Sequence, residues 1–408
     1  MPHHEHFDPL ASTRTADGPE LDVFVCGTVF LDIIFTGLSH LPAAGEEVWC
    51  DGMGSAPGGI ANLAVASQRL GLRTGLAAAF SDDVYGDFCW STLAEQENVD
   101  LSRSRRFEGW HTPVTVSMAE PEDRAMVTHG HDAPIDPTAM IGPPPTASAA
   151  IVDLSPDTSL RGTPEQPSWV ELARRQGTRL FADVGYDPTG GWDQAVLDSL
   201  QLCYAFTPNA LEAMAYTRTT SPYEAMYALA DHVPLAVVTM GSGGAIALDS
   251  ATGEEASVPA LRLTALDPTG AGDVFGASIV LGTLARWPLA DRLAFASLSS
   301  ALAVQQFGGS LAAPGWGDIA DWWHAQRAQS NGTAYHQAVL RRYAFLDELI
   351  PRVPVDAGRR ARATIARRSD VGSATLPEPP GPMPPEPVPA EPVPAEPVSA
   401  EPVPRSQP

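Results

Sequence analysis

The run Asp267-Pro268-Thr269-Gly270-Ala271-Gly272-Asp273-Val274-Phe275 places three small residues between two carboxylates, ahead of an apolar stretch that predicts a helix over 271–285. Because residues 270–272 carry almost no side chain, their backbone N–H groups can converge on one oxyanion at the positive end of that helix. Asp273 would then lie beside a bound phosphate. There a carboxylate can accept the proton of a substrate hydroxyl that attacks the terminal phosphorus of a nucleotide. The alternative is a glycine-rich turn that Asp273 merely caps.

A second glycine turn, Pro57-Gly58-Gly59-Ile60-Ala61-Asn62, lies nearer the N-terminus. It precedes an amphipathic helix over 63–70 that Gly71 ends, so Asn62 stands at a helix start. Asp32 follows shortly after a buried strand. Each feature has a plainer alternative, the glycine pair as a tight turn and Asp32 as a turn residue.

Strand and helix patterns alternate from about residue 149 onward, which predicts a mostly parallel sheet with helices on both faces. Ligands in such sheets bind at the carboxyl ends of the strands. Four polar residues fall at such ends: Asp153, Asp183, Asn209 and Thr239. Stretches over 45–50, 112–118 and 124–129 alternate like exposed strands and predict a small second sheet.

Two of these strand ends continue into motifs. Pro208-Asn209-Ala210-Leu211-Glu212 has the spacing of a capping box, so the Asn209 and Glu212 side chains can serve a helix start, a metal ion or both. Thr239-Met240-Gly241-Ser242-Gly243-Gly244 is a glycine-rich turn after a core strand, a pattern common enough to be weak evidence by itself.

The charge composition limits the partners. All 25 basic residues are arginine, and the formal net charge is −24. This balance argues against nucleic acid and against an anionic membrane. A helix N-terminus offsets only about 0.3–2 kcal/mol of the cost of binding phosphate, so we expect Mg²⁺ and arginine to share that task. The absence of lysine excludes a Walker-type phosphate lysine.

The cysteines and the termini predict a cytoplasmic protein. The four cysteines lack paired metal spacing and are expected to be reduced core thiols: Cys26, Cys50, Cys89 and Cys203. No signal peptide pattern or apolar run of spanning length is present in the sequence. The histidines within residues 1–6 read as part of a polar leader rather than as a metal site.

Four segments follow from composition and pattern. We expect a flexible leader over 1–20, a catalytic domain over 21–316 with lid strands within about 41–56 and 105–130, and a helical extension over 317–354. The last segment, 355–408, holds arginines and then Pro/Glu/Ala/Val repeats, which cannot form a core and predict disorder.

Together the two glycine motifs resemble the signatures of the ribokinase-like carbohydrate kinases, the PfkB family, over about residues 21–316. The resemblance implies a three-layer α/β/α domain with a mostly parallel central sheet and a small β-sheet lid. It also implies transfer of the terminal phosphoryl group of ATP to a hydroxyl of a sugar-like acceptor. Relatives often dimerise through lid strands, which makes a homodimer an expectation here.

The resemblance also implies a role for each matching residue. Asp273 would be the base, and the anion hole would be formed by Gly270, Ala271 and Gly272. The ATP phosphates and ribose would be met by Thr239, Gly241 and Gly244. Mg²⁺ would be held by Asn209 and Glu212, partly through water. The acceptor hydroxyls would be met by Asp32, Gly58, Gly59 and Asn62. A monovalent cation such as K⁺ would lie at Asp267 and Thr269.

The loop at Gly59 departs from the family pattern. Only Ile60 and Ala61 separate Gly59 from Asn62, one residue fewer than in many sugar kinases, and Ile60 offers no hydrogen bond where ribokinases use lysine. The acidic lid region has few basic side chains that could bind a second phosphate on the acceptor. The candidates are Arg103, Arg105, Arg106 and Arg124. We therefore expect an unphosphorylated sugar, sugar acid or nucleoside as acceptor. The alternatives are a nucleoside kinase of the same fold, a non-catalytic regulatory binder and, least favoured, a Rossmann oxidoreductase.

Overall fold

The computed structural model describes residues 7–119, 124–154, 160–185, 187, 190–306, 308–329 and 332–360. These residues belong to one compact unit, residues 1–368. The leader histidines, the turn expected at 120–123 and the Pro/Glu/Ala/Val repeats lie outside the described residues. Among the described residues, no helix is long and apolar enough to cross a membrane.

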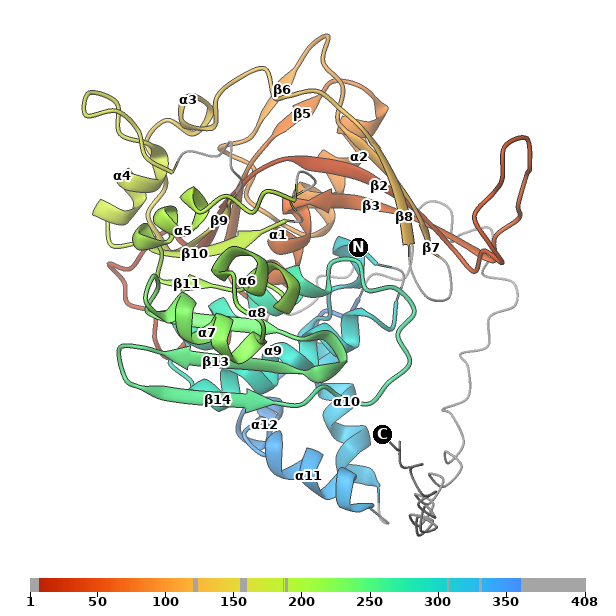
Figure 1. The fold of residues 1–408 in the computed structure, drawn as a ribbon, viewed down its shortest axis with the longest axis vertical. Helices are drawn as coiled ribbons and strands as arrows, with labels where there is room; N and C mark the ends of the chain where they lie inside the picture. Colours follow the sequence, from red (N-terminus) through yellow and green to blue (C-terminus); the bar gives the residue numbers. More distant parts are fainter. Residues whose placement is uncertain are drawn as a thin grey trace, which may run out of the picture. The chain divides into compact units, whose positions relative to one another are not determined.

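The centre of the fold is an eight-stranded sheet (Figure 1). Its strands, in spatial order, are β14 (Glu254–Val258), β13 (Ala245–Asp249), β12 (Leu235–Thr239), β11 (Ala205–Phe206), β10 (Arg179–Val184), β9 (Ala147–Leu154), β1 (Leu21–Cys26) and β4 (Thr74–Ala77). All neighbours from β4 to β12 are parallel, and β13 and β14 are antiparallel additions at one edge. The expectation of a mostly parallel sheet is confirmed.

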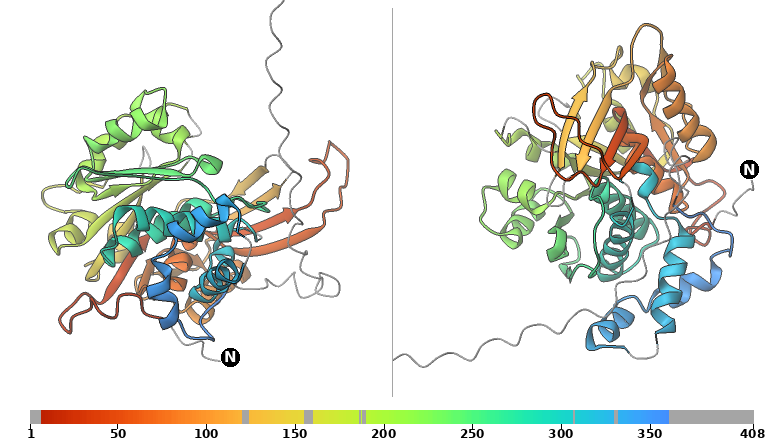
Figure 2. Two further views of the ribbon diagram at one scale, coloured as in Figure 1. Left: turned by 90° about the horizontal axis from the view of Figure 1, so that it is seen from below. Right: turned by 90° about the vertical axis from the view of Figure 1, so that its right-hand side faces the viewer.

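Helices cover both faces of this sheet, as the left view of Figure 2 shows. One face carries α1 (Ile60–Arg69), α8 (Ala271–Leu284) and α9 (Leu289–Ala303), and the other carries α3 (Pro137–Ile141), α4 (Trp169–Arg175), α5 (Ala195–Ser199), α6 (Ala210–Thr217) and α7 (Pro222–Ala230). In β1, Val23 and Val25 join the first core, whereas Phe24 packs edge-on against Trp169 in the second. Strands buried on both faces explain the continuous apolar runs in the sequence.

A four-stranded lid sheet stands beside the main sheet (Figure 1). Its order is β3 (Gly52–Gly59), β2 (Val29–Thr36), β7 (Val114–Ala119) and β8 (Arg124–His129). The strand expected over 45–50 is wrong, because the chain turns there: Gly45 has φ +84°, and the Glu46 carboxylate accepts the Ala43 N–H at 2.9 Å. Pairing with β2 resumes only at Gly52, opposite Thr36.

Two short strands and one helix complete the region beside the lid. They are β5 (Ala79–Ser81), β6 (Arg105–Phe107) and α2 (Val84–Ser91), which a π-helical turn over Thr92–Gln96 extends. Asp83 caps α2 by accepting the N–H groups of Tyr85 and Gly86.

The C-terminal helices are α10 (Trp316–Ala328), α11 (Ala334–Arg342) and α12 (Leu346–Leu349). Trp323 and Tyr343 are buried in the same core as α8 and α9. The Trp316 indole N–H donates to the Leu70 carbonyl at 2.9 Å, which ties α10 to the end of α1. These helices therefore pack on the α/β core.

Candidate active site

The anion-binding loop is the N-terminus of α8. Gly270 precedes the helix with φ +79°, a left-handed conformation that favours glycine. Gly272 is exposed, and among the described residues no protein group accepts a hydrogen bond from its amide. The free amide and the positive end of a 14-residue helix therefore point to the place where an anion would bind.

A buried carboxylate fixes this loop. Asp267 is 1% exposed, and its two oxygens accept the amide N–H groups of Thr269 and Gly308, each at 2.9 Å. The Gly309 N–H donates to the Thr269 carbonyl at 3.2 Å. A Cβ at position 308 would lie 2.5 Å from an Asp267 oxygen, so only glycine fits there. The chain after α9 thus holds the loop before α8.

Asp273 and Asn62 meet at the junction of α8 and α1. The Asn62 Nδ2 donates to the Asp273 Oδ2 at 3.0 Å. The Asn62 side chain is 7% exposed, and its Oδ1 is buried without a hydrogen-bond partner. A buried acceptor without a donor costs roughly 1–3 kcal/mol, so a ligand hydroxyl that donates to it would gain binding energy.

The lid contributes Asp32 from β2. Its carboxylate is 8% exposed and lies against Gly58, where a Cβ would come within 1.9 Å of Asp32 Oδ2. Gly59 has φ +61°, and a Cβ there would lie 2.5 Å from the Thr28 carbonyl oxygen. The glycine pair therefore lets β3 run directly into α1 with the lid carboxylate beside it. Asp32 lies in a strand and is not a turn residue.

Carboxylates gather at the carboxyl edge of the main sheet. Asp153 and Asp183 are register partners at the ends of β9 and β10. Asp153 is exposed at the end of its strand, yet partial desolvation by the surrounding protein raises the pKa of its carboxyl to about 6. Burial raises the pKa of Asp183 well above its ordinary value, and the charges of Asp273, Asp153 and Glu212 raise it further. These four groups therefore share one electrostatic environment.

The same environment acts on Asp273. Burial raises its pKa to about 7, and the charge of Asp153 adds to the effect, while the hydrogen bond from Asn62 opposes it. A carboxylate with a pKa near neutrality suits a general base, because it is ionised at working pH yet accepts a proton readily.

Asp153 and Asp183 were expected at strand ends but not as site residues. Asp153 and Asp183 lie at the ends of neighbouring parallel strands, where ligands bind in such sheets. The strand register shows this, and the sequence alone does not.

Asn209 and Glu212 form a complete capping box at the start of α6. The Asn209 side chain accepts the Glu212 N–H at 3.0 Å, and the Glu212 carboxylate accepts the Asn209 N–H at 2.9 Å. The prediction that Asn209 and Glu212 can cap a helix start is therefore confirmed. Glu212 is also 8% exposed, and burial raises its pKa, so a cation nearby would offset the cost of its charge.

The glycine loop after β12 lies next to this capping box. The Thr239 N–H donates to the Pro208 carbonyl at 3.1 Å, which places the end of β12 beside the start of α6. At Gly244, φ is +94° and a Cβ would lie 2.0 Å from the Val258 carbonyl oxygen, so the backbone conformation and close packing require glycine at this position. Gly241 is exposed with φ +53° and open space around its Cα, so its backbone is accessible to a ligand.

Two of the four candidate arginines for a second phosphate are engaged elsewhere, and Arg105 is exposed on β6. Arg106 pairs with Asp87 and donates to the Ser81 carbonyl. Arg103 donates to the Ile141 carbonyl at 3.3 Å. The Arg124 side chain lies outside the described part of the chain.

The chain is similar in sequence to known carbohydrate kinases. A model of the pfkB family of carbohydrate kinases matches residues 20–315. The chain is 27% identical over 315 residues to a ribokinase from Schizosaccharomyces pombe, with 72% of this chain and 95% of the relative covered. It is 29% identical over 312 residues to a fructokinase from Klebsiella pneumoniae, with 71% and 92% covered.

A solved structure shares the architecture. The structure of Arabidopsis thaliana ribokinase complexed with ribose and ATP aligns with a TM-score of 0.57 at 19% identity, covering 73% of this chain and 96% of the ribokinase. The three-layer arrangement with a mostly parallel central sheet is therefore the ribokinase-like fold.

Proposed function

Because the chain belongs to the pfkB family of carbohydrate kinases, we propose that Asp273 is the general base of an ATP-dependent sugar kinase. Asp273 takes the proton of an acceptor hydroxyl, the hydroxyl oxygen forms a bond to the γ-phosphorus, and the bond to the β–γ bridging oxygen breaks as ADP leaves. The hydrogen bond that holds the Asp273 carboxylate to Asn62 at the start of α8 is the observation that carries this proposal.

The anion hole follows from the same helix start. The amides of Gly270, Ala271 and Gly272 would receive the charge that develops on the transferred phosphoryl group. The free Gly272 amide supports this role, whereas the Ala271 N–H already donates to Pro268 O at 3.2 Å.

ATP and Mg²⁺ are assigned to the carboxyl edge of the main sheet. Thr239, Gly241 and Gly244 would approach the nucleotide, and Asn209 and Glu212 would hold Mg²⁺ partly through water. Carboxylate oxygens are the ligands that Mg²⁺ prefers, and the buried Glu212 is a suitable donor. Mg²⁺ would neutralise phosphate charge, which a protein without lysine must achieve by other means.

The acceptor is assigned to the space between lid and helix starts. Asp32, Gly58, Gly59 and Asn62 would meet its hydroxyls. The free Asn62 Oδ1 and the Asp32 carboxylate are acceptors, which suit a polyol. Since Arg106 and Arg103 are engaged elsewhere and Arg105 alone of the described candidates is left for a second phosphate, an unphosphorylated sugar, sugar acid or nucleoside is the substrate class we propose.

A monovalent cation such as K⁺ is proposed beside Asp267 and Thr269. The support is the buried Asp267 carboxylate, which accepts two amide N–H groups and fixes the loop before α8. Replacing K⁺ by tetramethylammonium in the assay should lower turnover if the cation stabilises this loop, and equal rates in the two salts would remove this assignment.

A homodimer through the lid is also proposed. The edge strand β8 exposes Met126 (53%) on one face of the lid sheet and Val127 (63%) on the other, so a second lid paired along this edge would cover apolar surface. Sedimentation velocity on the wild type and on Met126→Glu checks this, with dimer expected only in the former.

A cytoplasmic location is supported by the cysteines. All four are free thiols. Cys26, Cys89 and Cys203 are buried, and burial raises the pKa of each to about 12, as expected for inert core thiols in a reducing compartment. The expectation of a core thiol is wrong for Cys50, which is only half-buried.

The test of the proposed function is ATP-to-ADP turnover across a panel of sugars, sugar acids and nucleosides. One acceptor that stimulates turnover in the wild type identifies the substrate class. A chain that binds ATP but turns over no acceptor in the panel would count against the kinase and favour a non-catalytic binder.

A further inference from the structure

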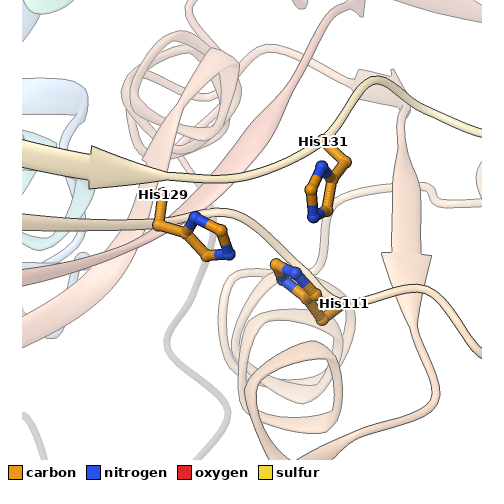
Figure 3. A group of neighbouring side chains, drawn as sticks. All are labelled: His111, His129 and His131. Carbon is orange, nitrogen blue, oxygen red and sulfur yellow. The ribbon is translucent and has the colours of Figure 1, made fainter.

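Three histidines lie together at the base of the lid, outside the candidate active site. Figure 3 shows the imidazole rings of His111, His129 and His131 facing one another from two chain segments. Each ring offers a nitrogen, and these nitrogens all lie within 4.8 Å of one another. Within the described residues, no other group of three or more His, Cys, Asp or Glu side chains is gathered in this way.

The rings are arranged around a common centre. His111 stacks on His129 with ring centroids 5.0 Å apart, and His131 meets both rings closer to edge-on, at 5.1 and 5.3 Å. His111 is half-buried, while His129 and His131 are exposed. Two of the three rings can therefore turn about their side-chain torsions without displacing the core.

The backbone that carries the rings is fixed at several points. His129 ends β8 as the register partner of Val114 in β7. A Cβ at Gly130 would lie 2.6 Å from the Pro113 Cβ, so the glycine lets the two segments touch. The Trp110 indole N–H donates to the Asp132 carbonyl at 3.1 Å and so links the residue before His111 to the residue after His131.

The deeper segment is anchored to the body of the protein. Thr112 is fully buried, and its hydroxyl lies 2.9 Å from the Ser81 hydroxyl and accepts the Ser81 N–H at 3.2 Å. His111 therefore presents its ring from a rigid position. A ligand set that the fold holds before any ion arrives loses less entropy on binding.

We propose that His111, His129 and His131 form a binding site for Zn²⁺. Three imidazole nitrogens suit a borderline-soft ion such as Zn²⁺ and not the hard Mg²⁺ of the kinase reaction. Tetrahedral Zn²⁺ with Zn–N bonds of about 2.0–2.1 Å needs nitrogens roughly 3.3 Å apart. Small rotations of the exposed His129 and His131 rings bring them to that spacing. Three protein ligands leave the fourth position open to water.

The site would clip the lid hairpin at its base. The ligands stand just before β7 and at the end of β8, so the ion joins the two ends of the hairpin. Because the ion binds the folded hairpin and not the unfolded chain, its binding free energy stabilises the hairpin. In the lid, β7 pairs with β2, the strand that carries Asp32. The proposal does not depend on the kinase assignment.

The first experiment measures zinc binding. The background is the full chain with His3, His4 and His6 replaced by glutamine, because that leader is a second possible zinc ligand. Equilibrium dialysis with elemental analysis should give one Zn²⁺ per chain. His111→Gln, His129→Gln and His131→Gln should each weaken binding at least about tenfold, and His324→Gln, an exposed histidine on α10, should not.

The second experiment measures stability in the same proteins. Saturating Zn²⁺ should raise the Tm of the background by roughly 2–5 °C and raise the Tm of His129→Gln by clearly less. Because His129 is exposed, the two proteins should melt alike in chelator, which excludes misfolding as the cause. Zinc that binds only when the leader histidines are present would overturn the proposal, as would equal affinity in His129→Gln and the background.

Discussion

Asn62 and Asp273, 211 residues apart in the chain, are joined by a 3.0 Å hydrogen bond between the starts of α1 and α8. The bond orients the Asp273 carboxylate and favours its ionised form, against burial and the charge of Asp153. The same Asn62 side chain leaves its Oδ1 free. One amide thus links the proposed base to the proposed acceptor site.

Asn62→Ala should therefore change both the pH dependence and the acceptor KM. In the wild type, kcat/KM should rise with pH as the Asp273 carboxyl, with its pKa of about 7, loses its proton. Without the Asn62 donor that pKa rises, so the acidic limb of the profile should move to higher pH. Steady-state kinetics over pH 5–9 check this. An acidic limb that stays in place would mean that Asn62 does not act on the base.

Gly272→Ala tests the proposed anion hole without disturbing the fold. A Cβ at position 272 meets no atom within 4 Å, so the free energy of unfolding should change by less than about 1 kcal/mol. The methyl group would instead occupy space that the phosphoryl group needs, and kcat should fall by about 10²–10³. Gly308→Ala is the matched control, because its Cβ would meet Asp267 and should lower stability by about 1–3 kcal/mol. Full activity in Gly272→Ala would argue against the anion hole.

Asp183→Asn should stabilise the ligand-free protein at alkaline pH. The folded-state pKa of Asp183 is raised, so the folded state binds more protons than the unfolded state between about pH 4 and that pKa. The free energy of unfolding therefore falls as the pH rises through this window. Asparagine removes the effect, so Asp183→Asn should raise the free energy of unfolding at pH 8 and change it little at pH 4.

Urea unfolding at both pH values measures this difference. Asp198→Asn, an exposed position in α5, is the control and should be neutral at either pH. An Asp183→Asn protein that is less stable than the wild type at pH 8 would show that the carboxylate is held by favourable contacts.

Closure of the lid over the acceptor should suppress hydrolysis of ATP by water. Asp32, proposed to meet the acceptor, lies in the lid strand β2 beside Gly58, so acceptor binding and closure are expected to be coupled. ATP hydrolysis without acceptor should be at least about 10²-fold slower than acceptor phosphorylation. Equal rates would mean that the lid has no such role.

Local motifs were the part of the fold that sequence predicted best. The helix after the glycine triad begins at Ala271 as expected, and Asn209 and Glu212 form the capping box that their spacing allowed. Both features depend on hydrogen bonds within a few residues, so the sequence determines them locally. The helix after Gly59 begins at Ile60, three residues earlier than expected, because β3 leads directly into it.

The sequence could not predict features that depend on how distant segments align in the folded protein. The strand expected over 45–50 lies at 52–59, since its position is set by pairing with β2 and not by its own alternation. The contact of Asn62 with Asp273 and the coupling of Asp153 with Asp183 arise only when distant segments align. The histidine group divides between two segments in the same way.

The most direct test of the account is Asp273→Asn, with ATP affinity and acceptor-stimulated turnover measured on the same protein. Asparagine keeps the size of the side chain but cannot accept the proton. We expect nearly unchanged ATP affinity by calorimetry and a kcat lower by about 10²–10⁴. Turnover equal to that of the wild type would contradict the assignment of Asp273 as the general base.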